Sequence, residues 1–203
     1  MTAPQIETLR VGAHPTNCYL VKNPKTHELV IVDAGAEAET IIAAVEDWKP
    51  LAVLATHGHY DHIGAVDAVC GHFGIPLYVH KEDISKLADP EGNGSLLFDR
   101  EMTVNTPALP LEEGQELDLA GFSFTVLHTP GHSRGSCCFL LPENQGVFCG
   151  DTLFKGGYGR TDIGDGSFAE IKQSLRRLLF DLPEQVAYPG HSASTFAGKG
   201  SLV

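Results

Sequence analysis

The sequence has few cationic residues and no long apolar segment. Its 14 Lys and Arg residues stand against 26 Asp and Glu residues, which gives a formal net charge of −12. Nucleic acids and anionic membranes attract proteins through basic patches, so neither is an expected partner. No span of about 18 apolar residues is present, and the N-terminus MTAPQIETLRVGAHPTNCYLV lacks the pattern of a secretory signal. We therefore expect a cytoplasmic protein.

Cysteine is also scarce, which argues against a disulfide framework. The five cysteines are odd in number and show no CxxC spacing. We expect buried, reduced thiols, because free cysteine behaves as a small hydrophobic residue. Hydrophobic residues make up 42% of the chain and charged residues 20%, as in soluble globular proteins. A chain of 203 residues can bury a substantial core, and we expect a single domain over residues 1–203.

Short apolar runs bounded by Gly, Pro, Asn and Asp predict many strands. The expected strands are 5–11, 17–22, 28–33, 51–55, 76–80, 115–119, 122–128, 136–142, 146–149 and 186–189. Helical periodicity predicts helices over 37–48, 62–74 and 167–180, with a shorter one over 81–88. Residues 89–107 resemble a long surface loop or lid. This order of elements predicts an α/β (α+β) fold in which sheets pack together with helices outside.

The stretch THGHYDH concentrates three histidines and an aspartate in the loop after the apolar strand LAVLAT. His57 and His59 alternate in an extended segment, so both can point toward one ion. Asp61 and His62 follow where the chain turns into a helix and can serve a second ion. Imidazole and carboxylate ligands suit zinc, iron or manganese. A solvated surface loop is the alternative for this stretch taken alone.

Three further segments repeat the same arrangement of a polar ligand type in a tight turn after a strand. HTPGHSRGS contains His132, VFCGDTLF contains Asp151, and AYPGHS contains His191. Functional groups often lie in such turns at strand ends. Four such segments in one chain favour a common metal site over surface polarity.

Together these segments resemble the metallo-β-lactamase-fold hydrolases over nearly the whole chain, as do VDAG at 32–35 and TNCYLV at 16–21. The resemblance implies a four-layer αββα sandwich with a metal site at one edge. It also implies ligand sets of His57, His59 and His132 for one ion and Asp61, His62 and His191 for the other, with Asp151 bridging them. Such ions lie about 3.5–4 Å apart and share a hydroxide, which would attack a carbonyl while Asp61 orients it or takes its proton.

The stretch DTLFKGGYGRTD resembles the glyoxalase II and persulfide dioxygenase branch of this family. The resemblance places Arg160 as the basic residue that binds a substrate carboxylate. Two positions depart from glyoxalase II, since Ala193 stands where a tyrosine is usual and Thr161–Asp162 where aromatic residues are usual. We also expect no C-terminal helical domain of the kind that supplies further glutathione contacts in that enzyme. The small single-domain bacterial glyoxalase II-like proteins match its length and its PGHSAST segment best.

We therefore expect a binuclear metallohydrolase that acts on a small acyl thioester of the S-lactoylglutathione type. The expected cofactors are two divalent ions, zinc first and iron or manganese as alternatives. The alternative functions are a mononuclear-iron persulfide dioxygenase and a lactonase of the same fold. The expected partner is a small thioester or ester, and the sequence leaves the oligomeric state open.

Several other polar residues carry weaker expectations. His14 can line the pocket, although a structural role is favoured. Asp33 either hydrogen-bonds to a ligand histidine or serves turn chemistry at a strand end. The remaining histidines are expected in surface or structural roles; they are His27, His72, His80 and His128.

Overall fold

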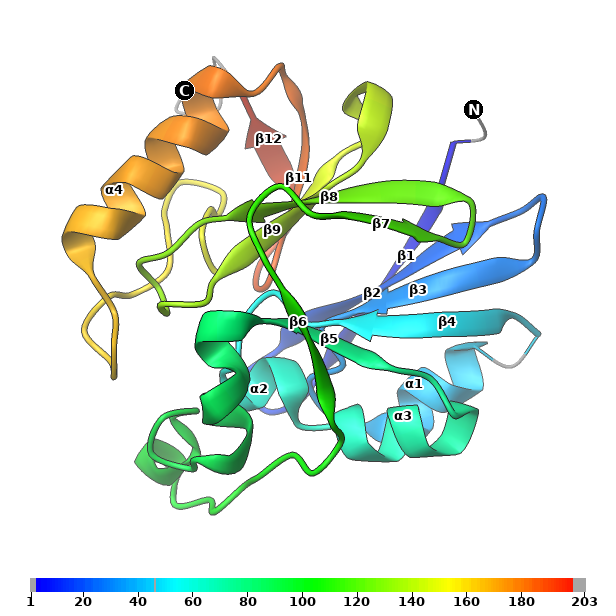
Figure 1. Cartoon of the computed structure of the whole chain (residues 1–203), viewed down its shortest axis with the longest axis horizontal. Helices are drawn as coiled ribbons and strands as arrows, with labels where there is room; N and C mark the ends of the chain where they lie inside the picture. The colour runs from blue at the N-terminus through cyan, green and yellow to red at the C-terminus, as the bar shows by residue number, and fades with distance from the viewer. Residues whose placement is uncertain (1–2, 46, 199–203) are drawn as a thin grey trace.

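Two six-stranded sheets pack face to face in the computed structural model, which describes residues 3–45 and 47–198 (Figure 1). The first sheet has the order β1-β2-β3-β4-β5-β6, with β1 Gln5–Val11, β2 Thr16–Asn23, β3 Glu28–Val32, β4 Lys49–Leu54, β5 Leu77–His80 and β6 Ala108–Leu111. The second has the order β12-β11-β10-β9-β8-β7, with β7 Glu116–Leu119, β8 Phe122–His128, β9 Cys137–Leu140, β10 Val147–Gly150, β11 Gln185–Pro189 and β12 Thr195–Ala197.

Helices cover the outer face of each sheet (Figure 1). The first sheet is covered by α1 Ala38–Val45, α2 Tyr60–Ile63 and α3 Val66–Phe73, and the second by α4 Phe168–Arg176 with the π-helical turn η4 Arg177–Asp181. Three 3₁₀ segments are η1 Lys81–Ala88, η2 Ser95–Phe98 and η3 Pro142–Asn144. The four layers form the predicted αββα sandwich, which is thereby confirmed.

Strand periodicity explains why both faces of the first sheet are buried. In β2, Cys18 and Leu20 belong to the core beneath α1 and α3, whereas Tyr19 and Val21 belong to the core between the sheets. Side chains alternate between faces along a strand, so a strand buried on both faces is apolar almost throughout. The inter-sheet core also receives Phe124, Phe139 and Phe148 from the second sheet.

The structure differs from the sequence prediction in the helix expected over 62–74. The chain forms α2 and α3 with a break around Gly64. A side chain at Gly64 would come within 2.5 Å of the Gly35 carbonyl oxygen, so the two segments pack at backbone contact. This contact is tertiary, and the apolar periodicity of the segment carries no sign of it.

Other boundaries differ as well. The helix expected over 37–48 ends at Val45, with Glu46 outside the described residues, and the one over 167–180 changes from α to π after Arg176. The loop expected over 89–107 contains η2. Two strands were not predicted. β6 holds Pro110, which suits an edge position, and β12 is only three residues long.

No helix within residues 3–45 and 47–198 is long and apolar enough to cross a membrane. The expected cytoplasmic location stays a prediction. All five cysteines are buried and free, as predicted, and burial raises the pKa of the Cys138 thiol to about 11.

Removing an aromatic ring from the inter-sheet core should destabilise the fold strongly. Phe139 is fully buried between the sheets, so Phe139→Ala leaves a cavity and should lower the free energy of unfolding by about 3–5 kcal/mol. Urea unfolding followed by circular dichroism measures the change. The control is Phe168→Ala at the start of α4, where the ring is 56% exposed and the expected change is within about 0.5 kcal/mol. Equal losses in both variants would contradict the assignment of the core.

Candidate metal centre

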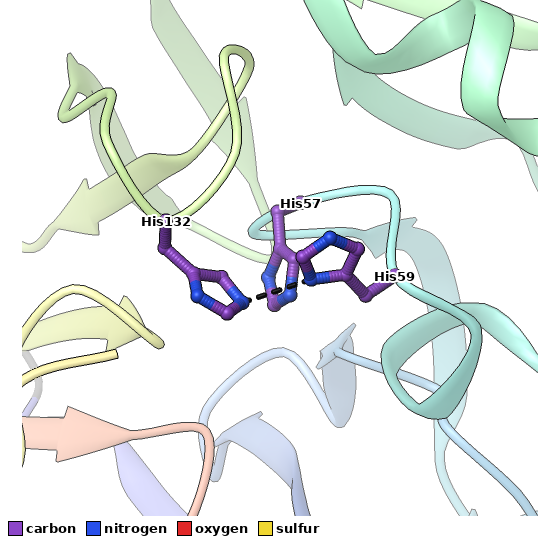
Figure 2. A group of neighbouring side chains, drawn as sticks. All are labelled: His57, His59 and His132. Carbon is purple, nitrogen blue, oxygen red and sulfur yellow. Dashed lines mark hydrogen bonds between the residues drawn. The ribbon is translucent and has the colours of Figure 1, made fainter. Parts of the chain in front are cut away.

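The predicted ligand residues meet at the edge where the two sheets come together. The loop after β4 and the start of α2 supply His57, His59, Asp61 and His62 from the first sheet. Turns after β8, β10 and β11 supply the others from the second sheet, namely His132, Asp151 and His191. Figure 2 shows the rings of His57, His59 and His132 turned toward one another, although they come from two distant loops.

These side chains form three groups whose possible ligand atoms lie within 4.8 Å of one another. The groups are His57, His59 and His132; His57, His62 and Asp151; and Asp61, His62 and His191. The first and third match the two expected ligand sets.

Asp151 lies between the two sets. Its Oδ2 is 3.5 Å from the Nε2 atoms of both His132 and His191, and its Oδ1 is 3.4 Å from His62 Nε2. The chain must approach this carboxylate closely, because a side chain at Gly190 would collide with Asp151 Oδ1 and come within 2.5 Å of His62 Cε1. Asp151 therefore contacts histidines of both expected sets, and its bridging role stays a prediction.

The outward nitrogen of four histidines is held by a neighbouring group. His62 Nδ1 lies 2.9 Å from Asp33 Oδ2, and His57 Nδ1 lies 3.1 Å from Thr56 Oγ1. His132 Nδ1 lies 2.8 Å from the Arg160 carbonyl oxygen, and His191 Nδ1 lies 2.9 Å from the Pro15 carbonyl oxygen. Such contacts fix the orientation of a metal-binding imidazole and leave its other nitrogen for the ion.

Buried polar atoms without a hydrogen-bond partner also gather here. Among the described residues there are six such side-chain atoms, and four belong to this cluster: Nε2 of His57, His59 and His62, and Oδ1 of Asp151. Buried polar groups are normally satisfied, so a group of unpaired ones needs an explanation. A cation placed among them would supply the missing partner.

The electrostatics of the cluster favour a cation. Burial lowers the pKa of His59 to about 3, and burial and the neighbouring histidines hold the pKa of His57 well below its ordinary value. These two rings are therefore neutral, which is the form that binds metals. At the other end burial opposes protonation of His62, but the carboxylates of Asp33, Asp151 and Asp61 outweigh it and raise the pKa of His62.

Asp83 ties together the two loops that carry the first ligand set, and sequence reasoning missed it. This carboxylate is fully buried in η1. Its Oδ2 accepts hydrogen bonds from Gly58 N at 2.8 Å and Ser133 Oγ at 2.6 Å, and its Oδ1 accepts one from Gly135 N at 2.8 Å. Gly58 lies between His57 and His59, and Ser133 follows His132, so one carboxylate sets the spacing of both loops. Burial raises the pKa of Asp83, which these donors oppose.

Backbone contacts join the sheets on either side of the centre. Cys137 N donates to Thr56 O at 2.8 Å, and Asn17 N donates to Gly190 O at 2.7 Å. The Asn17 amide and the Tyr19 hydroxyl both donate to Pro189 O, at 3.0 and 2.6 Å. The loop that carries His191 is thereby attached to β2.

A cavity of about 560 Å³ opens over the cluster. Arg160 lines it as expected, but its guanidinium forms two hydrogen bonds with Asp162, at 2.8 and 3.0 Å. Its role in substrate binding stays a prediction.

His14 also lines the cavity and lies 3.2 Å from the Tyr60 hydroxyl, so the pocket alternative left open for it is the correct one. Asp33 takes both of its expected roles, since it also accepts from Thr56 N.

Other residues that line this cavity were not predicted. Leu97 and Phe98 of η2 line the cavity, as do Arg10 of β1 and Ile163. Apolar letters within the segment expected to be a lid were the only available signal for η2. His80 and His128 instead stack on each other, with ring centroids 4.0 Å apart, in keeping with their expected structural roles.

Comparisons with known proteins agree with this arrangement. The pattern of the family described as "Metallo-beta-lactamase superfamily" matches residues 11–191. The hydroxyacylglutathione hydrolase GloC of Haemophilus influenzae is 33% identical over 205 residues, which cover 96% of this chain and 93% of that protein. The structure of the BLEG-1 B3 metallo-beta-lactamase matches with 38% identity and a TM-score of 0.90, covering 95% and 94% of the two chains. TTHA1623 in a di-iron-bound form matches with 35% identity and a TM-score of 0.84, covering 93% of each.

Asp83→Ala should destabilise the metal-free protein. The change leaves three buried donors without their acceptor, so the free energy of unfolding should fall by about 3 kcal/mol or more. Urea unfolding in the presence of a chelator measures this without any contribution from metal binding. Asp118→Ala, on the exposed side of β7, is the matched control, with an expected change within about 0.5 kcal/mol. A loss below about 1 kcal/mol for Asp83→Ala would show that the three donors find other partners.

Proposed function

Because the chain belongs to the metallo-β-lactamase superfamily and is a metal-dependent hydrolase, we propose a specific reaction for it. It hydrolyses small acyl thioesters of the S-lactoylglutathione type with two divalent ions. The observation that carries the proposal is the set of four buried atoms without a hydrogen-bond partner among seven converging His and Asp side chains. They fit divalent ions because neutral imidazoles and carboxylates are the donors that zinc, iron and manganese accept.

Each of the two ligand sets would hold one ion. His57, His59 and His132 would hold one ion, and Asp61, His62 and His191 the other. Asp151 would contact both. When bound, such a pair of ions makes water nucleophilic near neutral pH and neutralises the negative charge that develops on a carbonyl oxygen.

The residues around the ions supply orientation and proton transfer. Asp61 Oδ2 lies 3.2 Å from both Thr16 Oγ1 and His191 Nε2, so this carboxylate has a fixed direction at the cavity floor. We assign it to orient the attacking water and to accept its proton. Asp33 holds His62, and the Arg160 carbonyl oxygen holds His132, so both rings keep their orientation during the reaction.

The proposed substrate class follows from the cavity and from one relative. A volume of about 560 Å³ suits a small molecule, and apolar side chains of Leu97, Phe98 and Ile163 form one wall. GloC is named for hydrolysis of hydroxyacylglutathione, and it aligns with nearly the whole chain. Thioesters are also good substrates for this type of centre, because a thiolate leaves more readily than an alkoxide.

Metal content and activity should rise together. We expect elemental analysis of protein purified without oxygen or added metal to give close to two ions per chain, a number that follows from the two ligand sets. Such protein should hydrolyse S-lactoylglutathione faster than a lactone or a β-lactam, and a chelator should abolish the reaction. One ion per chain, almost all iron, together with oxygen consumption in the presence of glutathione persulfide would favour the dioxygenase instead. Hydrolysis of a β-lactam or a lactone alone would also contradict the thioester assignment.

Removal of the bridging carboxylate should affect both ions. Asp151 lies within 3.5 Å of nitrogen atoms on three histidines, so Asp151→Ala should lower metal content below one ion per chain and remove detectable thioester hydrolysis. Elemental analysis after dialysis and a thiol-release assay measure the two effects. Asp118→Ala serves as the control, because Asp118 lies on the exposed side of β7. An Asp151→Ala protein that keeps both its metal ions and its thioesterase activity would contradict the proposal.

A further inference from the structure

We propose that Arg10 forms an anion subsite that binds a carboxylate on the tail of the substrate, at the end of the cavity beside His191. This subsite is separate from the position expected for Arg160. The inference deepens the proposed function, because it names the chemical class of the substrate tail. It concerns binding, so it can be tested without the hydrolytic reaction.

Arg10 lies in β1, the edge strand of the first sheet, directly across from Asn17 of β2. It lines the cavity over the metal centre together with Pro15 and Ser192. The Pro15 carbonyl oxygen contacts His191 Nδ1, and Ser192 follows His191 in the sequence. Arg160 instead adjoins His132, whose Nδ1 lies 2.8 Å from its carbonyl oxygen. The two arginines therefore stand next to different histidines of the centre.

The guanidinium of Arg10 is available to a ligand. Arg10 is exposed, and its guanidinium has no hydrogen-bond or ion-pair partner among the residues that the structure describes, 3–45 and 47–198. The guanidinium of Arg160, by contrast, is paired with Asp162. The nearest acidic residue of β1, Glu7, is itself paired with Lys22 at 2.6 Å. In a chain of net charge −12, an unpaired guanidinium at the wall of the cavity offers an anion a local attraction.

Arg10 also lines a second, smaller cavity of about 390 Å³. Arg10 and Ser192 line both cavities. The smaller cavity has hydroxyl groups on its wall, from Thr8, Tyr188 and Ser194. A substrate tail bound beside Arg10 and Ser192 would therefore be near residues that carry a guanidinium and hydroxyl groups. A guanidinium can bind a carboxylate through two parallel hydrogen bonds, and hydroxyl groups can donate further ones.

The floor of this subsite is held in place by groups that do not compete for the ligand. Asn17 Nδ2 donates to Ser192 O at 2.8 Å and to Pro189 O at 3.0 Å. Ser192 has φ of 68°, a left-handed conformation that is uncommon for a residue other than glycine, and the Asn17 contact holds it there. The subsite thus has a fixed base, which lowers the entropic cost of binding a flexible tail.

The cavity that Arg10 lines also has apolar lining residues. Leu97 of η2 is 63% exposed and Phe98 is 42% exposed, and both line the cavity. Large apolar side chains at a cavity mouth are suited to an apolar part of a ligand. The wall at Arg10 is suited to an anionic part. We infer a thioester with an apolar portion near η2 and a carboxylate at Arg10.

The test compares two non-hydrolysable ligands that differ only at their two carboxyl groups. S-hexylglutathione carries two carboxylates, and its bis-amide replaces both with neutral groups of nearly the same shape. Isothermal titration calorimetry on metal-loaded protein should show that wild type prefers the diacid. Arg10→Gln should weaken binding of the diacid about tenfold, the scale of one lost charge-assisted hydrogen bond, and leave binding of the bis-amide unchanged.

Two further variants sharpen the comparison. Arg10→Lys should keep part of the preference, because it keeps the charge without the planar fork. Arg176→Gln, in the last turn of α4 and outside the cavity, should leave both affinities unchanged. The proposal is overturned if wild type binds neither ligand, if it binds both equally, or if Arg10→Gln keeps the wild-type preference.

The calorimetric result is independent of the hydrolytic assay. Failure to hydrolyse S-lactoylglutathione, with the Arg10-dependent preference intact, would remove the thioester reaction and leave the subsite standing. Hydrolysis by wild type without any effect of Arg10→Gln on the diacid preference would remove the subsite and leave the reaction standing.

Discussion

The candidate metal centre depends on one constraint: loops from two different sheets must keep a fixed separation. The buried carboxylate of Asp83 meets this constraint, because it accepts hydrogen bonds from Gly58 on one loop and from Ser133 and Gly135 on the other. A charged group in the interior is costly unless donors surround it. That cost makes the arrangement specific, since a shift of either loop would leave a buried charge without its partners.

The seven residues that gather at the centre could be singled out from the sequence because each one follows a local pattern. A strand end followed by a tight turn is visible in the letters around His132, Asp151 and His191, and the resemblance supplied their grouping. The layers could be predicted for a similar reason, since the central residues of β2 and most of β3 are apolar on both faces and must be covered on both sides. The sequence therefore predicts those features that depend on strand periodicity and on the residues of tight turns.

The remaining features depend on contacts between distant segments. Asp83 looks like an acidic residue in the first turn of a short helix, and nothing nearby in the sequence indicates that Gly58 and Gly135 lie on it. The helix break at Gly64 follows from backbone contact with Gly35. Arg10 stands out because it lies beside the cavity over the cluster without an ion-pair partner among the described residues, a property of the folded chain. The sequence predicted that Arg160 binds a substrate carboxylate, but it did not indicate that the guanidinium forms an ion pair with Asp162.

The two parts of the site are built with different degrees of constraint. Each metal-facing side chain has neighbours that hold it, and several backbone contacts join the sheets around the cluster. The cavity wall is held more loosely: η2 exposes Leu96, Leu97 and Phe98, and the Gly-rich segment after Asp151 is joined to η1 mainly through the Lys86–Asp165 ion pair at 2.8 Å. Substitutions in the wall can therefore change which tail the cavity accepts without disturbing the cluster beneath it. For this reason a ligand motif identifies the centre, whereas the substrate has to be inferred from wall residues such as Arg10.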